Sequence, residues 1–210
     1  MTSSSDLRMM ATISSICSVE MISGGHITRL SRMPRTISPF AIDMYLPAFP
    51  EIAKALQTTT ARVSLSLASY FAGLAAGQLA YGPLLDRFGR KLPLYAGLLL
   101  FIVASVLCLF VRNVESLVAL RFVQAVGGCA AGVAAMAMVR DFFPAHETAK
   151  IISLLILVIS ASPMFAPSVG VLVAVQLGWQ WVFIVLAAFV LVMLLVSRWV
   201  LPDGHPPDRS

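Results

Sequence analysis

The chain has 210 residues, of which 59% are hydrophobic and only 12% are charged, whereas an average soluble domain has about 25% charged residues. This composition excludes an ordinary soluble domain and indicates a polytopic membrane protein. The formal net charge of +5 does not point to nucleic acid, because the basic residues lie in short segments between long apolar runs.

The N-terminal part does not predict a regular first span. Residues 1–36 are interrupted by Glu20 and have no clean hydrophobic core before a cleavage site, so we expect a leader or a disordered tail. The segment 37–56 contains FAIDMYLPAFP, in which Asp43 is the one charge. Arginines precede it at 32 and 35, which leaves Thr36–Pro50 as 15 residues, or about 22 Å of helix. This first helix should be short or irregular.

The rest of the chain contains apolar runs long enough to cross a membrane, for which a helix needs about 20 apolar residues. Val63–Leu85 and Leu92–Val111 carry no charge, and Leu117–Val139 carries Arg121 alone. Ile151–Ser197 is a charge-free run of 47 residues, which Gly178 should divide into two helices. The fold class is therefore an all-α membrane protein with short loops. The predicted spans are 37–56, 63–85, 92–111, 117–138, 151–174 and 179–199, in a six-helix bundle of residues 37–201 that is followed by a polar tail or truncated linker, 202–210.

The lysines and arginines predict the orientation. One side of the membrane would hold most of them, namely Arg87, Arg90, Lys91, Arg140, Lys150, Arg198 and Arg209, and the other side would hold Lys54, Arg62 and Arg112. Because cytoplasmic loops carry the excess of positive charge, we expect both termini in the cytoplasm and the bundle in the cell inner (plasma) membrane.

Residue types that carry enzyme chemistry are missing from the predicted spans. The three histidines lie in tails or loops, the chain has no GxxxxGK[ST] motif, and HETAK has Lys150 where a zinc protease needs its second histidine. Cys17, Cys108 and Cys129 have no metal-site spacing and are expected to be free thiols that fill apolar space. We therefore expect no enzyme, no metal and no cofactor.

Asp43 and Arg121 are the charges within the apolar runs of the predicted spans. Buried charges in membranes usually face a bundle interior or a water-filled cavity, and both residues lie about 6–10 Å from the predicted outer helix ends at the rise of an α-helix. Two interpretations remain open: a static ion pair that fixes helix packing, or a pair whose carboxyl changes protonation and couples transport to protons. Candidates for lining an adjacent cavity are Tyr45, Tyr70, Gln124 and Gly128.

Glycines and prolines suggest close packing and kinks. Gly73/Gly77 and Gly128/Gly132 are GxxxG pairs, which allow helices to approach closely, and plain packing is the favoured interpretation. In the predicted fifth helix, Pro163 and Pro167 precede Gly170, so we expect a helix-5 kink that could belong to a moving element.

Three motifs resemble the major facilitator superfamily. YGPLLDRFGRK matches the loop between helices 2 and 3 of these transporters, and LRFVQAVGG resembles their helix-4 motif RxxQxxG through Arg121, Gln124 and Gly127. APSVG resembles the helix-5 antiporter motif, with Ala166 and Val171 replacing glycines. Together with IDMYLPAFP these motifs resemble the Bcr/CflA branch of drug:proton antiporters. The resemblance covers the N-terminal six-helix half of such a transporter.

The resemblance implies a function and site roles. Asp43 would be the proton-linked carboxylate, with Arg121 as its partner, and the proton gradient would be the energy source. The cytoplasmic loop motif would comprise Gly82, Asp86, Arg87, Gly89, Arg90 and Lys91, with Arg140 nearby. The implied activity is efflux of bicyclomycin- or chloramphenicol-type drugs, with the bilayer, an amphipathic drug and a second copy or separate C-terminal half as partners. The alternative is a non-transporting membrane fragment or interaction module from a disrupted transporter gene.

Overall fold

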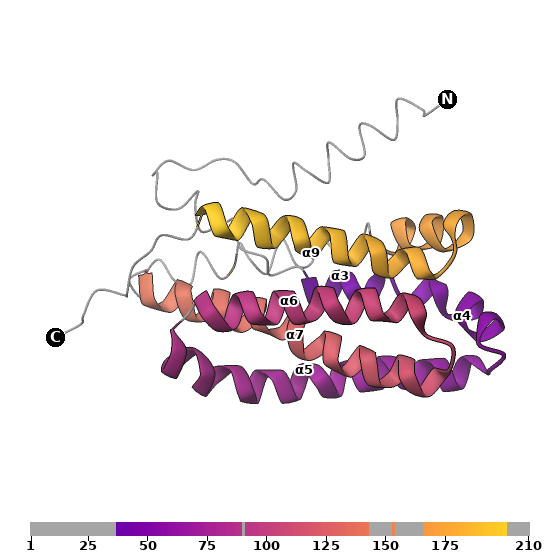
Figure 1. Ribbon diagram of the computed structural model, residues 1–210, viewed down its shortest axis with the longest axis horizontal. Coiled ribbons are helices and arrows are strands. Elements are labelled where there is room, and N and C mark those ends of the chain that lie inside the picture. Colours follow the sequence, from indigo (N-terminus) through magenta and orange to yellow (C-terminus); the bar gives the residue numbers. More distant parts are fainter. Residues whose placement is uncertain (1–36, 90, 143–152, 154–165, 201–210) are drawn as a thin grey trace, which may run out of the picture.

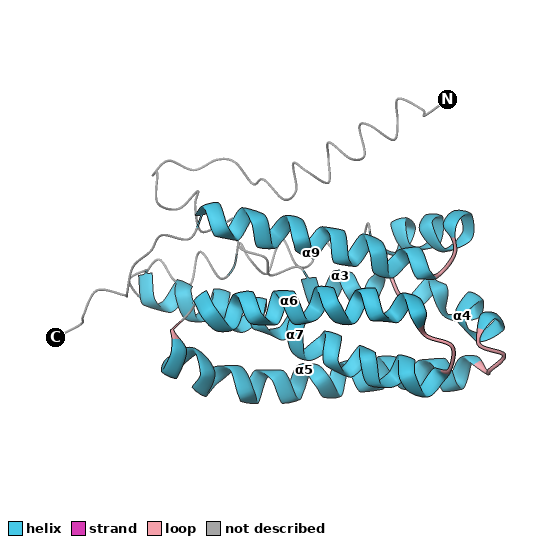
Figure 2. Ribbon diagram, in the orientation of Figure 1, coloured by secondary structure: helices cyan, strands magenta, loops and turns pink. Residues whose placement is uncertain are grey.

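The computed structural model describes residues 37–89, 91–142, 153 and 166–200. These residues form helices joined by short loops, and no strand occurs among them (Figures 1 and 2). The predicted all-α fold class is confirmed. The predicted tails 1–36 and 202–210, Arg90, Pro163 and most of 151–165 lie outside the described residues.

The long helices run side by side along the longest axis of the molecule (Figure 1). They are α5 (Thr60–Phe88), α6 (Lys91–Leu107), which continues into the short 3₁₀ helix η2 (Cys108–Phe110), α7 (Val114–Phe142) and α9 (Gln180–Val200). A shorter apolar helix, Ala166–Leu177, precedes α9. α5 and α7 both extend beyond the predicted ends at 85 and 138, because helix formation does not stop where the apolar run stops.

Helix ends follow local signals in the sequence. The Thr59 side chain accepts a hydrogen bond from the Arg62 N–H (3.3 Å) at the start of α5, and the Asn113 side chain accepts one from the Ser116 N–H (3.0 Å) at the start of α7. Both are N-cap interactions, which satisfy amide groups that have no partner inside the helix. Gly89 (φ 77°) ends α5 and Gly178 (φ 101°) separates the last two helices. The predicted break at Gly178 is confirmed.

The first segment is irregular, as the sequence predicted. It consists of α3 (Ile37–Asp43), a turn, the 3₁₀ helix η1 (Leu46–Ala48) and α4 (Phe49–Ala55). Pro47 lies four residues after Asp43 and has no N–H, so the Asp43 carbonyl loses its helical hydrogen-bond donor. The Tyr45 N–H correspondingly bonds the Ile42 carbonyl (3.1 Å) in a tighter turn. The break therefore falls directly after Asp43.

α7 is the central helix, and glycines let its neighbours approach it. A Cβ added to Gly73 of α5 would lie 2.5 Å from the Phe122 carbonyl oxygen, and one added to Gly127 would lie 2.6 Å from the Phe101 nitrogen of α6. Gly77 is close to Cys129 in the same way. The predicted Gly73/Gly77 approach is confirmed. At Gly132 nothing among the described residues lies within 4 Å of an added Cβ, and the approach at Gly128/Gly132 stays a prediction.

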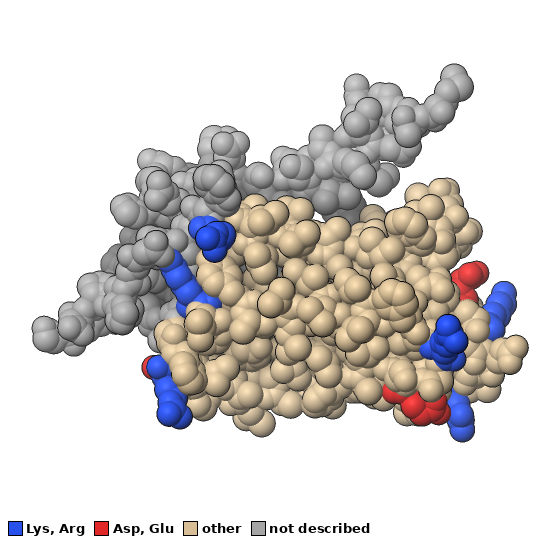
Figure 3. All heavy atoms as spheres, viewed as in Figure 1, with Lys and Arg blue, Asp and Glu red and all other residues tan. Residues whose placement is uncertain are grey.

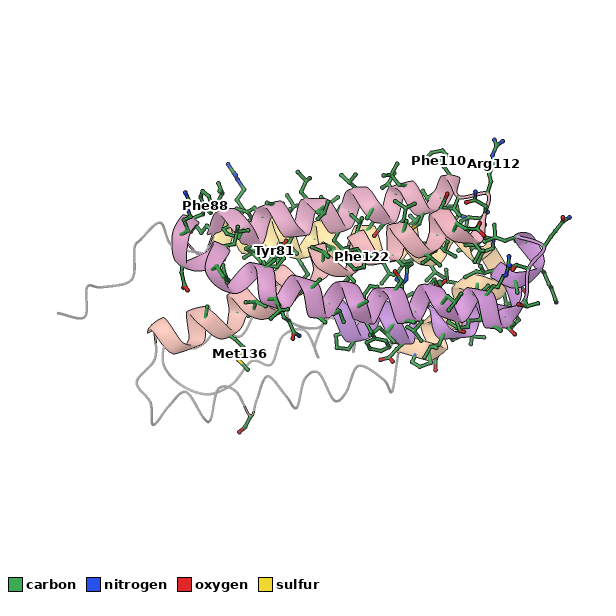
Figure 4. All side chains as sticks on the ribbon, turned by 90° about the horizontal axis from the view of Figure 1, so that it is seen from below. Tyr81, Phe88, Phe110, Arg112, Phe122 and Met136 are labelled. Carbon is green, nitrogen blue, oxygen red and sulfur yellow. The ribbon has the colours of Figure 1, made fainter. Side chains whose placement is uncertain are left out.

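The surface has the pattern of a membrane-spanning bundle. Four of the described helices are long and apolar enough to cross a membrane: Thr60–Phe88, Lys91–Phe110, Val114–Ala137 and Gln180–Arg198. Charged side chains gather at the two ends of the molecule and leave an uncharged band between them (Figure 3). Large apolar side chains such as Leu79, 81% exposed, cover this band. Phe88 lies at one end, and Phe110 and Arg112 lie at the other (Figure 4).

Because Gly73 lies against α7 and Gly82 does not, we expect alanine substitutions at these two positions of α5 to change the free energy of unfolding in opposite directions. Gly73→Ala should lower the free energy of unfolding by about 1–3 kcal/mol, because the backbone at Phe122 cannot move aside as a side chain could. Gly82→Ala, where nothing in the described part of the chain lies within 4 Å, should raise it by about 0.5–1 kcal/mol through helix propensity. Denaturant unfolding of the detergent-solubilised variants measures both values. Equal effects of the two substitutions would contradict the packing explanation.

Candidate functional site: a buried arginine in an aromatic cage

Arg121 lies seven residues into α7 and is fully buried. Gln124 and Gly128 follow it at helical spacing and are buried as well. A buried guanidinium in an apolar bundle needs compensation, because removing an ion from water costs several kcal/mol.

Three aromatic rings surround the Arg121 guanidinium. Its central carbon lies 4.1 Å from the centroid of the Tyr45 ring, 4.3 Å from that of Tyr70 and 5.9 Å from that of Phe183. We call these three residues the aromatic cage. Since a desolvated cation–π contact contributes about 2 kcal/mol, the cage supplies much of the required compensation. It also joins α7 to α5, to α9 and to the turn after α3.

A chain of hydrogen bonds leads from Arg121 to α6. The Nη1 group of Arg121 donates to Oε1 of Gln124 (2.7 Å), and Nε2 of Gln124 donates to the Ser105 hydroxyl (2.6 Å). Ser105 in turn donates to the Phe101 carbonyl (2.8 Å). Gln124 and Ser105 are fully buried. The cation is therefore fixed through neutral groups on two helices.

The Tyr45 ring is held by a separate pair of hydrogen bonds. The Ser66 hydroxyl donates to the Val63 carbonyl (2.6 Å) and lies 2.7 Å from the Tyr45 hydroxyl. Because the single Ser66 proton is used by Val63, Tyr45 is the donor in the second bond. Ser66 thus holds the Tyr45 ring against Arg121.

The predicted ion pair is absent from this arrangement. Within the described residues no salt bridge joins Asp43 to Arg121, and Oδ2 of Asp43 is buried without a hydrogen-bond partner. Nε and Nη2 of Arg121 are likewise buried and without a partner. These two nitrogens form one edge of the guanidinium, the edge that binds a carboxylate in bidentate fashion. The site therefore contains an unused two-donor edge, and the Asp43 carboxyl, which has an unused oxygen, does not occupy it.

The cavity-lining candidates gather around Arg121 but are not open to solvent. Tyr45, Tyr70 and Gln124 are each 0% exposed. They contribute to the cage and to the polar chain rather than lining an open surface. Their role in binding a drug stays a prediction.

The residues of the predicted loop motif belong largely to helices. Gly82, Asp86 and Arg87 lie in the last turns of α5, Gly89 ends it, and Lys91 begins α6. Gly82 lies inside the predicted span 63–85, whereas the assignment of Asp86 and Arg87 to a loop is corrected, since α5 continues to Phe88. Arg140 lies in the last turns of α7. The latch role of this motif stays a prediction.

The two described residues of the predicted helix-5 kink lie in the helix Ala166–Leu177. Pro167 is near its start, and Gly170 packs against the backbone of Met44 in the turn after α3. The kink stays a prediction, while the Met44 contact was not expected from the sequence.

Sequence reasoning missed three residues of the site: Ser66, Ser105 and Phe183. The two serines carry a weak signal, since they are polar residues inside charge-free spans. Phe183 carries none, because it is one of many apolar residues in α9. No group of three or more metal-ligating side chains occurs in the described part of the chain.

Comparison with known proteins agrees with the motifs. The family model of the Major Facilitator Superfamily matches residues 35–210. Similar proteins include the uncharacterized MFS-type transporter YdgK of Bacillus subtilis, 41% identical over 166 residues, which are 77% of this chain and 41% of that protein. The bicyclomycin resistance protein homolog of Haemophilus influenzae is 34% identical over 180 residues, which are 86% of this chain and 44% of that protein. The multidrug resistance protein MdtL of Escherichia coli (strain UTI89 / UPEC) is 35% identical over 168 residues, which are 80% and 43% of the two chains.

The chain therefore belongs to the major facilitator superfamily, a family of membrane transporters, as the motifs predicted. It spans less than half the length of these curated relatives. Its helices correspond to the N-terminal half of the transporter fold.

The aromatic cage predicts that Tyr45→Phe destabilises the protein less than Tyr45→Leu does. Tyr45→Phe keeps the ring over Arg121 and loses the hydroxyl bond to Ser66, which should lower the free energy of unfolding by about 0.5–1.5 kcal/mol. Tyr45→Leu also removes the cation–π contact and should lower it by about 2 kcal/mol more. Denaturant unfolding in detergent measures both. If the two variants lose the same stability, the ring does not stabilise Arg121.

Proposed function

We propose that this chain supplies the proton-coupling half of a Bcr/CflA-type drug:proton antiporter that exports amphipathic drugs of the bicyclomycin or chloramphenicol type. The observation that carries the proposal is the buried two-donor edge of Arg121, which has no hydrogen-bond partner in the site. The names of the relatives from Haemophilus influenzae and Escherichia coli support the drug class.

Proton coupling would use Asp43 and Arg121 in two states. With Asp43 protonated, the carboxyl is neutral and Arg121 keeps its neutral partners in the cage. When Asp43 loses its proton, the carboxylate gains from a nearby cation, and the Nε/Nη2 edge of Arg121 is free to accept it as a bidentate partner. A movement of the turn after α3 toward α7 would convert one state into the other.

The energy source would be the proton gradient, with no bound cofactor. Each proton that crosses 100 mV releases about 2.3 kcal/mol, which is sufficient for export against a modest drug gradient. We place the protein in the inner (plasma) membrane with both termini cytoplasmic, since arginines and lysines mark that side.

A complete transport path would need a second six-helix half, because superfamily transporters bind substrate between two such halves. A second copy of this chain or a separate C-terminal half would fill that place. A bundle that meets neither partner would be a non-transporting membrane protein.

Drug accumulation in cells tests the proposal. Cells that produce the chain, alone or joined to the C-terminal half of the Bacillus subtilis relative, should accumulate several-fold less chloramphenicol than empty cells. Asp43→Asn should abolish the difference, because an amide cannot release a proton. A protonophore should abolish it as well.

Glu51→Gln is the matched control, since it makes the same chemical change at an exposed carboxylate of α4. It should leave drug accumulation unchanged. If cells that produce the Asp43→Asn chain accumulate as much drug as cells that produce the unchanged chain, both with the chain alone and with the joined chain, the antiport proposal fails.

A further inference from the structure

Gly170 is in direct contact with the backbone beside Asp43. A Cβ added to Gly170 would overlap the Met44 carbonyl oxygen and lie 2.9 Å from Met44 Cα and 3.0 Å from its carbonyl carbon. All three atoms belong to the main chain, so no side-chain rotation can relieve the overlap. The helix Ala166–Leu177 can therefore lie against the turn at Met44 only because residue 170 has no side chain.

The main chain is accessible at Met44 because the first helix is broken there. α3 ends at Asp43, Met44 and Tyr45 form the turn, and the N–H groups of these two residues bond Phe40 and Ile42 (3.1 Å each). Met44 and Tyr45 are fully buried. The turn thus packs its backbone, rather than a side chain, against the fifth helix.

The residues on either side of Met44 are the two that matter for coupling. Asp43 precedes it and has a buried oxygen without a hydrogen-bond partner. Tyr45 follows it and stacks on the Arg121 guanidinium at 4.1 Å. A displacement of Met44 would therefore be transmitted to the carboxyl and to the aromatic cage together.

We propose that Gly170 is a positioning residue for Asp43: it seats the Met44 backbone and so fixes where the carboxyl lies relative to Arg121. This inference rests on the proposed function only in treating Asp43 as the proton site. Through this contact, movement of the proline-containing fifth helix displaces Asp43 directly. Gly170 thus couples the position of the fifth helix to the position of Asp43, in addition to any part that it has in a kink.

Chemical modification of Asp43 tests the link without requiring transport. Dicyclohexylcarbodiimide reacts with protonated carboxyl groups in apolar surroundings, and mass spectrometry of the peptide that contains Asp43 reports the modified fraction. The full chain in detergent or liposomes is treated across a range of pH. The Asp43→Asn chain should show no adduct at this position, so an adduct that is missing from its spectrum is assigned to Asp43.

Gly170→Ala should shift the pH profile of Asp43 modification by about half a pH unit or more, a factor of about three in the protonation equilibrium. Gly132→Ala is the matched control, since it adds the same methyl group where no described residue lies within 4 Å, and it should leave the profile unchanged. A Gly170→Ala profile that superimposes on that of the unchanged chain overturns the proposal.

Pro47→Ala provides a second test if Gly170→Ala does not insert or fold. It restores the amide that the Asp43 carbonyl lacks, straightens the turn and moves Met44 away from Gly170. It should shift the modification profile as well. Where Gly170→Ala does fold, the shifts of the two substitutions should not add in the double variant, because both act through Met44. An unchanged profile in Pro47→Ala, or additive shifts in the double variant, contradicts the link. The modification of Asp43 is measured in a chain that need not transport the drug. A negative result in the export experiment therefore does not decide the result of this test.

Discussion

The burial of the Arg121 guanidinium is the constraint on which the rest of the bundle depends. A cation removed from water must be compensated, and here the compensation comes from the rings of Tyr45, Tyr70 and Phe183 and from Gln124. The rings belong to α5, to α9 and to the turn after α3, so the cation can be buried only if these segments meet on α7. One side chain thereby fixes the relative positions of helices that are far apart in sequence.

Close helix approach makes this arrangement possible. Gly73 places α5 against the Phe122 backbone, and Gly127 places α7 against the backbone of α6 at Phe101. Larger side chains at these positions would widen the spacing between helix axes and pull the rings and the Ser105 hydroxyl away from α7. The burial of Arg121 therefore depends on these glycines, because they set the distance between α7 and the helices that carry the groups that compensate its charge.

Most of the fold could be predicted from the sequence, but only part of the site. Charge-free runs predicted the long helices, and Gly178 predicted the break between the last two, because run length, charge and positive φ are local properties. The partners of Arg121 depend on tertiary contacts. The sequence indicated Asp43 because a carboxylate is visible as a charge, whereas nothing distinguishes Phe183 from its apolar neighbours until α9 is packed. The same reason explains why the sequence did not indicate the close contact of Gly127 with the Phe101 backbone.

The neutral character of the cage has a consequence for Asp43. If Arg121 were buried only by pairing with a carboxylate, protonation of that carboxyl would leave an uncompensated cation and destabilise the core by several kcal/mol. Here the rings and Gln124 hold the guanidinium without an ion pair to Asp43. The Nε/Nη2 edge is still available to a carboxylate. The compensation of the buried Arg121 cation thus does not depend on a charged Asp43, which is what the proposed proton cycle at Asp43 requires.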